Sequence, residues 1–96
     1  MRPSEALAKH REEVREILLG YHVENPRVFG SSARGEDTAS SDLDIIVERK
    51  GMLTYFDLAE LERELEALLG VKVDVRTVGE FSNRALARIQ GDFREI

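Results

Sequence analysis

The sequence predicts a small α/β (α+β) protein in which helices pack on one face of a mixed β-sheet. Three observations lead to this prediction. Two segments, 4–20 and 54–69, repeat apolar residues at helical spacing. Other short segments alternate apolar with charged residues, as half-buried strands do. Glycines and turn residues separate these segments, so helices and strands follow one another along the chain.

The length and composition indicate one domain, 1–96, with a single core. The chain is 42% hydrophobic and 34% charged, which is typical of a globular protein. Its net charge of -5 disfavours direct nucleic-acid contact or binding to an anionic membrane. It has no cysteine, which excludes thiolate catalysis and cysteine-bound zinc. Neither a signal-peptide pattern nor an apolar run of transmembrane length is present, so we expect a cytoplasmic location.

The first predicted element is a helix from Ser4 to about Gly20. Its apolar side chains recur at helical spacing, with charged residues at the other positions. Serine is typical of a helix start and glycine of a helix end. Asn25-Pro26 then indicates a turn, and a short strand is expected at 27–29.

The second half of the chain predicts two strands and two helices. The segment 42–48 reads as a strand, and 54–69 as an amphipathic helix that ends at Gly70. Valine alternates with lysine and aspartate over 71–75, which predicts another half-buried strand. Ser82 begins the last helix. The helices should cover one face of the sheet and leave the other face open.

Three aspartates are expected on that open face. Side chains alternate between the two faces of a strand, so Asp42 and Asp44 share one face while the apolar residues between them share the other. By the same alternation, Asp74 lies opposite the valines of its strand. If both strands bury their apolar residues under the same helices, all three carboxylates emerge together.

Clustered carboxylates repel one another, and a divalent cation removes that conflict. Oxygen ligands without cysteine or a suitable pair of histidines favour Mg²⁺ or Mn²⁺. We therefore predict a metal site formed by Asp42, Asp44 and Asp74. The alternative is that Asp-x-Asp is only the solvated end of a strand.

The glycine-serine pair upstream predicts a phosphate-binding turn. Gly30-Ser31 follows a predicted strand and precedes a short helix at 31–34. Glycine allows a ligand to approach the backbone, and the freed N–H groups favour phosphate oxygens. Ser31 adds a hydroxyl and Arg34 a counter-charge. Phosphate and metal sites together indicate a nucleoside triphosphate substrate.

Each of these residues also has a structural interpretation. Ser31 could only cap its helix, and Arg34 could form a salt bridge at the surface. Arg76 shares the face of Asp74 and could contact phosphate or neutralise a carboxylate, so we leave it outside the predicted site.

The motifs "GSSARG" and "SDLDIIV" resemble the signature of the minimal nucleotidyltransferases of the DNA polymerase β superfamily. In that signature Gly-Ser is followed by Asp-x-Asp and by a third acid on a later strand. Gly30 and Ser31 match the pair, Asp42 and Asp44 the two acids, and Asp74 in "VKVDVRTV" the third acid. The resemblance covers nearly the whole chain and implies a nucleotidyltransferase fold, a nucleotide substrate and metal dependence.

The resemblance also implies a biological setting. Many small members of this branch are antitoxins of HEPN-domain toxins and can transfer AMP to a tyrosine hydroxyl of the partner. We therefore expect a Mg²⁺-dependent transfer of AMP from ATP to a hydroxyl of a HEPN-type partner protein. The alternative is an antitoxin that neutralises its partner by binding alone. Transfer to a small molecule is a third hypothesis, which the lack of an extra domain disfavours.

Overall fold

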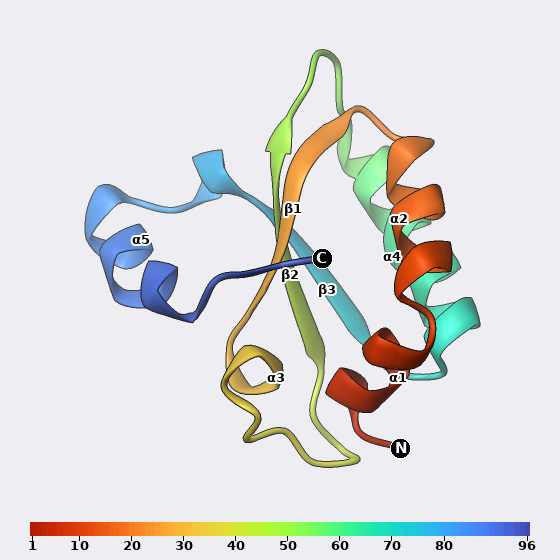
Figure 1. Ribbon diagram of the computed structural model, residues 1–96. Helices are drawn as coiled ribbons and strands as arrows, with labels where there is room; N and C mark the ends of the chain where they lie inside the picture. The colour runs from red at the N-terminus through yellow and green to blue at the C-terminus, as the bar shows by residue number, and fades with distance from the viewer.

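The fold is a four-stranded mixed β-sheet with helices α1, α2 and α4 on one face (Figure 1). The computed structural model describes residues 1–96. The strand order is β3-β2-β1-β4, in which β2 runs parallel to β3 and β1 runs antiparallel to both of its neighbours. The α-helices and strands are α1 (Pro3–Lys9), α2 (Arg11–Leu19), β1 (Val23–Phe29), α3 (Ser31–Arg34), β2 (Leu43–Arg49), α4 (Tyr55–Leu69), β3 (Val73–Thr77), α5 (Asn83–Ile89) and β4 (Arg94–Glu95). The predicted fold class is confirmed.

The main core lies between the sheet and these three helices. Leu43, Ile45 and Val47 of β2 meet Leu61 and Leu65 of α4, and none of the five side chains is exposed to solvent. Burial of each large aliphatic side chain contributes about 1.5–3 kcal/mol. None of the helices is both long and apolar enough to cross a membrane.

Helix α4 matches its predicted bounds because its ends carry clear chemical signals. The Thr54 hydroxyl accepts a hydrogen bond from the Asp57 N–H, and the Asp57 carboxylate accepts one from the Thr54 N–H. This reciprocal cap satisfies two donors that a helix start leaves free. At the other end Gly70 adopts φ 71°, a left-handed conformation that closes the helix.

The single helix predicted over 4–20 is wrong, because two helices meet at His10. The backbone of His10 has φ −116° and ψ 24°, outside the helical region. The break allows Ala6 and Leu7 of α1 and Val14 of α2 all to be buried in the core. The helical spacing of the apolar residues continues across the break, so the sequence pattern did not reveal it.

Strand β1 is longer than predicted, because Asn25-Pro26 lies inside the strand instead of ending a turn. The pairing register with β2 shifts between Glu24 and Arg27, which places a β-bulge there. Asn25 has φ 53°, which asparagine tolerates better than most residues. The turn predicted at Asn25-Pro26 is therefore wrong, because these residues form a bulge within the strand.

Strand β3 begins and ends two residues later than predicted. Its pairing with β2 starts where the Leu43 N–H donates to the Lys72 carbonyl, 2.8 Å away. The ladder then runs from Leu43 opposite Val73 to Val47 opposite Thr77. Asp42 therefore directly precedes β2 instead of beginning it.

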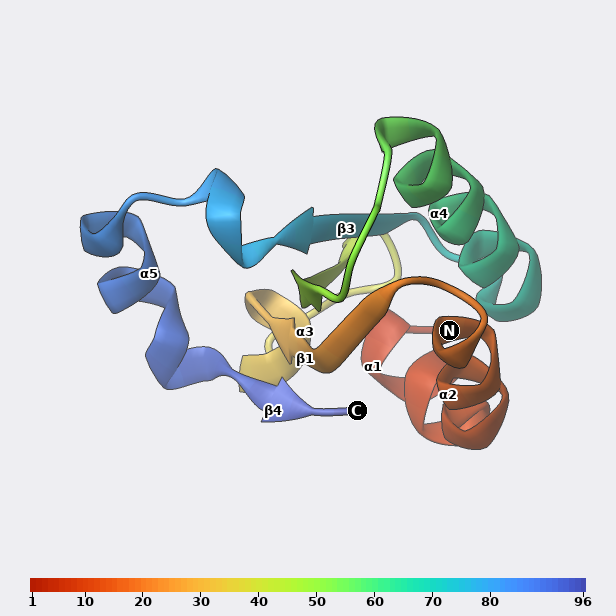
Figure 2. The same cartoon turned by 90° about the horizontal axis from the view of Figure 1, so that it is seen from above.

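The second face of the sheet was predicted to be open, but it is partly covered. Figure 2 shows α5 on the side of the sheet away from α2 and α4. The Phe29 ring of β1 packs edge-on against the rings of Phe81 and Phe93, with centroids 6.2 Å apart in each pair. Ile46, on the same face, is completely buried. The C-terminal segment thus forms a second, smaller apolar cluster and adds the unpredicted edge strand β4.

Candidate functional site

Two of the predicted acids lie side by side at the start of the parallel strand pair. Asp44 of β2 and Asp74 of β3 are direct register partners. Their neighbours along each strand, Leu43, Ile45 and Val73, are buried in the core on the other face. The strand alternation expected from the sequence therefore places both carboxylates away from the core. Asp42 lies two residues before Asp44, in the segment that leads into β2.

The glycine-serine turn touches this pair of strands directly. Phe29 pairs with Asp44 across the antiparallel strands, and Gly30 follows Phe29. Gly30 has φ 75° and ψ −155°, a conformation that is essentially restricted to glycine. A Cβ atom at Gly30 would lie 2.7 Å from Asp44 Oδ2. Both the backbone and the space therefore require glycine, and the turn that begins α3 lies against the carboxylate of Asp44.

The electrostatics of Asp44 show an acidic cluster. Its side chain is half-buried, and burial raises its pKa above the usual range. The charges of Asp74 and Asp42 raise the pKa further, while Arg76 opposes them. Asp44 therefore lies in the field of both other acids, as the sequence analysis expected.

The three carboxylates do not form a ready metal-binding group in the structure. No group of three acidic or histidine side chains is arranged to hold a metal ion as it stands. Arg76 Nε donates to Asp74 Oδ2 at 3.1 Å, and Lys72 Nζ lies 4.0 Å from Asp42 Oδ2. Basic side chains thus partly neutralise the outer two acids.

The donor set nevertheless fits a hard divalent cation. Asp42, Asp44 and Asp74 offer only carboxylate oxygens, which Mg²⁺ prefers. The mutual repulsion that raises the pKa of Asp44 is the conflict that a cation relieves. Asp42 is exposed, and Asp44 and Asp74 are half-buried, so solvent reaches all three side chains.

Arg34 and Ser31 occupy opposite ends of α3. Ser31 is the first residue of the helix, directly after Gly30. Arg34 donates to Glu36 Oε1 at 2.8 Å and to Asp92 Oδ2 at 2.7 Å. These bonds raise the pKa of its guanidinium, so Arg34 is held in a surface ion pair. Its role toward phosphate remains a prediction.

Two residues outside the predicted site bear on it. Arg76 lies between Asp74 and Glu80, with Nη1 3.6 Å from Glu80 Oε1, so it can hold or release the Asp74 carboxylate. Asp37, in the loop between α3 and β2, is buried, with 4% of its surface exposed. Strand alternation already placed Arg76 beside Asp74, whereas no spacing in the sequence indicated the burial of Asp37.

Asp37 anchors the loop that leads to Asp42. Its carboxylate accepts hydrogen bonds from the N–H and hydroxyl of Ser4, at 2.8 and 2.9 Å. Burial alone would raise its pKa, but these bonds outweigh burial and leave the pKa below the usual range. The loop is thereby attached to the start of α1.

Comparison with protein families gives a match over nearly the whole chain. The family model described as "Nucleotidyltransferase domain" matches residues 7–95. A Methanocaldococcus jannaschii protein, provisionally named a protein adenylyltransferase, is 44% identical over 73 residues, which are 76% of this chain and 81% of that protein. Protein adenylyltransferase MntA of Thermococcus cleftensis is 42% identical over 69 residues, which are 72% of this chain and 67% of that protein.

Solved structures share the fold. A structure provisionally described as a minimal nucleotidyltransferase superposes with a TM-score of 0.86 at 34% identity, covering 97% of this chain and 95% of the other. A complex of a tri-AMPylated Shewanella oneidensis HEPN toxin with its MNT antitoxin superposes with a TM-score of 0.69 at 18% identity. That match covers 92% of this chain and 69% of the other and shows similarity of fold alone.

Proposed function

Because the chain belongs to the nucleotidyltransferase domain family and is thus a nucleotidyltransferase, we propose that it transfers AMP from ATP to a hydroxyl group of a partner protein. The observation that carries this proposal is the meeting of three features at one point. The Gly30-Ser31 turn, the Asp44 carboxylate and its register partner Asp74 lie together at the start of the parallel strands.

The chain's own residues have distinct roles in the proposed reaction. Gly30 leaves the backbone open to the triphosphate, and Ser31 donates hydrogen bonds to phosphate oxygens. Asp42, Asp44 and Asp74 hold Mg²⁺. Bound there with ATP, the cation supplies positive charge that stabilises negative charge developing on the phosphate oxygens. The assembly of these groups orients the α-phosphate toward the acceptor.

The transfer balances as a displacement at phosphorus. The acceptor hydroxyl oxygen forms a bond to the α-phosphorus, and the bond from that phosphorus to the bridging oxygen of the β-phosphate breaks. Pyrophosphate leaves with the bridging electron pair. Asp74 accepts the hydroxyl proton in this scheme, because its carboxylate lies on the edge strand beside Asp44.

A protein acceptor is favoured by the relatives and by the surface. The similar proteins are named protein adenylyltransferases, and a solved complex with this fold contains a HEPN toxin that carries AMP groups. The net charge of -5 disfavours nucleic acid as the acceptor. A HEPN-type protein, with this chain as its antitoxin, is the partner that we propose.

Intact-mass spectrometry tests this proposal. The protein is incubated with a HEPN-domain protein from the same organism, ATP and Mg²⁺, and the partner should gain the mass of whole adenylyl groups. Asp42→Ala/Asp44→Ala should abolish the gain, whereas Glu24→Gln, an exposed acid away from the site, should retain it. A partner that loses toxicity without any change in mass would favour neutralisation by binding alone.

A further inference from the structure

An acidic hollow lies away from the candidate site, between α2 and α4. It has a volume of about 620 Å³ and is formed by the end of α2, the loop after β2 and the first half of α4. Four carboxylates and no lysine or arginine line it. These four acids are Glu16, Asp57, Glu60 and Glu64. The hollow therefore carries one sign of charge.

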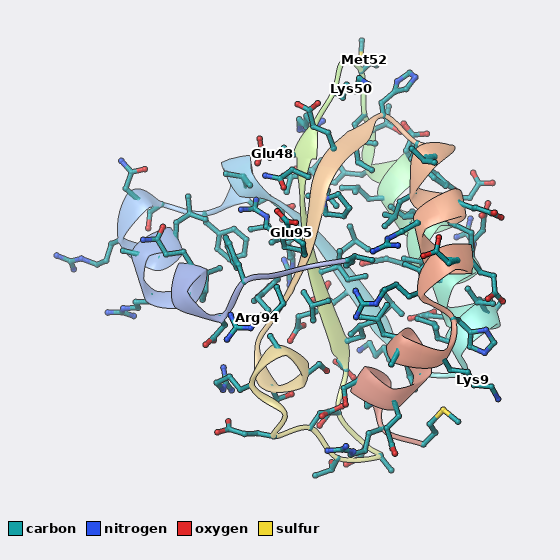
Figure 3. The ribbon with its side chains drawn as sticks, viewed as in Figure 1. Lys9, Glu48, Lys50, Met52, Arg94 and Glu95 are labelled. Carbon is teal, nitrogen blue, oxygen red and sulfur yellow. The ribbon has the colours of Figure 1, made fainter.

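One large exposed apolar side chain lines this hollow, and two others belong to residues next to its lining in the sequence. Phe56 is 87% exposed, Leu19 85% and Met52 78%. Met52 lines the hollow itself, Leu19 precedes the lining residue Gly20, and Phe56 precedes the lining residue Asp57. Figure 3 shows Met52 at the tip of the loop that follows β2. Single exposed apolar residues are common, but three of them within the lining or one residue from it favour an interaction surface.

The hollow also holds a strong negative field. Tyr21 donates its hydroxyl to Glu64 Oε1 at 2.9 Å. Burial, this hydrogen bond and the charges of Glu64, Glu60 and Asp57 raise the pKa of Tyr21 to about 12. None of the four acids of the hollow forms an ion pair, in contrast to Asp37, Asp42 and Asp74, which lie beside basic side chains. A positively charged ligand is the chemical complement of this surface.

We propose that this surface binds a basic amphipathic helix of another protein. The surface comprises Glu16, Leu19, Met52, Phe56, Asp57, Glu60 and Glu64, and we call it the α2–α4 surface. A helix that lies in a groove between two helices places apolar side chains at every third or fourth position against the groove. Its lysines and arginines reach the flanking carboxylates, while Leu19, Met52 and Phe56 contact its apolar face.

The position of the α2–α4 surface leaves the candidate active site free. Asp44 lies at the start of β2, whereas Met52 lies in the loop beyond the end of that strand at Arg49. In Figure 1 this loop and α3 lie at opposite ends of the molecule. A partner held at the α2–α4 surface would therefore not cover the nucleotide. The inference goes beyond the proposed reaction, because it concerns binding and requires no transfer.

Titration followed by nuclear magnetic resonance tests this inference. The probe is a synthetic helical peptide of leucine and lysine with one apolar face, and the matched peptide has glutamate in place of lysine. The lysine peptide should shift the amide signals of 16–22 and 52–64, and the glutamate peptide should not bind. Glu60→Lys and Phe56→Ser should each weaken binding about tenfold. Glu24→Lys, an equally exposed acid on β1, should leave the affinity within about threefold of wild type.

Three outcomes would overturn the proposal. The first is the absence of binding by the lysine peptide. The second is a set of shifts centred on Asp42, Asp44 and Asp74, because the peptide would then bind at the nucleotide site. The third is self-association of the protein that Phe56→Ser abolishes, because a second copy of the chain would then cover the surface. None of these outcomes bears on adenylyl transfer, which is measured separately.

Discussion

Gly30 shows how a single residue links the backbone to the candidate site. Its φ of 75° lies in the region that only glycine enters readily, and Asp44 Oδ2 occupies the space where a side chain would begin. Gly35 provides a natural comparison, because it has φ 73° but no atom within 4 Å of its Cβ position. The two glycines share a positive φ that would strain any other residue but differ in what surrounds them.

Gly30→Ala should therefore impair both stability and ATP binding, whereas Gly35→Ala should impair stability alone. The expected loss in free energy of unfolding is about 1–3 kcal/mol for Gly30→Ala and about 1–2 kcal/mol for Gly35→Ala. Chemical denaturation and calorimetric titration with ATP and Mg²⁺ measure the two effects. Equal ATP affinities in the two variants would show that crowding of Asp44 has no role.

Asp37 supplies a second prediction at this scale, because its buried carboxylate binds the N–H and hydroxyl of Ser4. Asp37→Ala should lower the free energy of unfolding at pH 7 by roughly 1–2 kcal/mol, the usual effect of losing a helix cap. The folded-state pKa is depressed, so this stabilisation is present above the unfolded value near 4 and is lost as the pH falls through the folded pKa.

Urea titrations of wild type and Asp37→Ala, from neutral pH to below the unfolded pKa, test whether the stabilisation by this carboxylate is lost on acidification. The difference between the two proteins should shrink below about pH 4. Glu24→Gln removes an equal charge from an exposed acid on β1 and should show no such trend. A difference that grows on acidification would mean that the carboxylate of Asp37 does not stabilise the folded state.

At the scale of elements, glutamate side chains accept hydrogen bonds from the otherwise unpaired N–H groups of the edge strand β3. The N–H groups of Val73, Val75 and Thr77 donate to the carboxylates of Glu66, Glu62 and Glu80, at 2.8 to 2.9 Å. Two of these acids belong to α4 and one to the turn after β3. The unpaired donors of an edge strand are a template for pairing with another chain, and these side chains occupy them.

Glu62→Ala should open this edge. The free Val75 N–H should reduce the free energy of unfolding by about 1–3 kcal/mol if it stays buried, and the variant should associate at high concentration through β3. Sedimentation velocity over a range of concentrations measures the association. Glu60→Ala alters the same helix without touching β3 and should remain as monodisperse as wild type. Identical sedimentation of the two variants would count against a protective role.

The elements differ in how far the sequence could predict them. Helix α4 was predicted closely because its leucine stripe and terminal glycine are local signals. The break at His10 was missed because the apolar spacing continues across it, and β4 was missed because two residues carry no pattern. Aspartate positions followed from strand alternation, but the pairing of Arg76 with Asp74 and the burial of Asp37 depend on tertiary contacts.

At the scale of the molecule, the residues of the main core and those of the candidate site lie on opposite faces of the sheet. Its main core faces α1, α2 and α4, whereas Asp44 and Asp74 face the other way. Loss of a site carboxylate should therefore leave the fold intact. Because burial and the charges of Asp74 and Asp42 raise the pKa of Asp44, Asp44→Asn removes an unfavourable charge and should raise the melting temperature of the protein without ligand. Differential scanning calorimetry in the absence of Mg²⁺ and ATP measures this rise, and a lower melting temperature would contradict it.

The central claim is that these carboxylates and the Gly30-Ser31 turn form one site for ATP and Mg²⁺. The most direct measurement is the rise in melting temperature when both ligands are added to wild type, Asp44→Asn and the surface control Glu24→Gln. Ligands that bind only the folded state stabilise it, so wild type and Glu24→Gln should show the same clear rise. Asp44→Asn should show little or none. An equal rise in all three proteins would contradict the claim, because the ligands would then bind without Asp44.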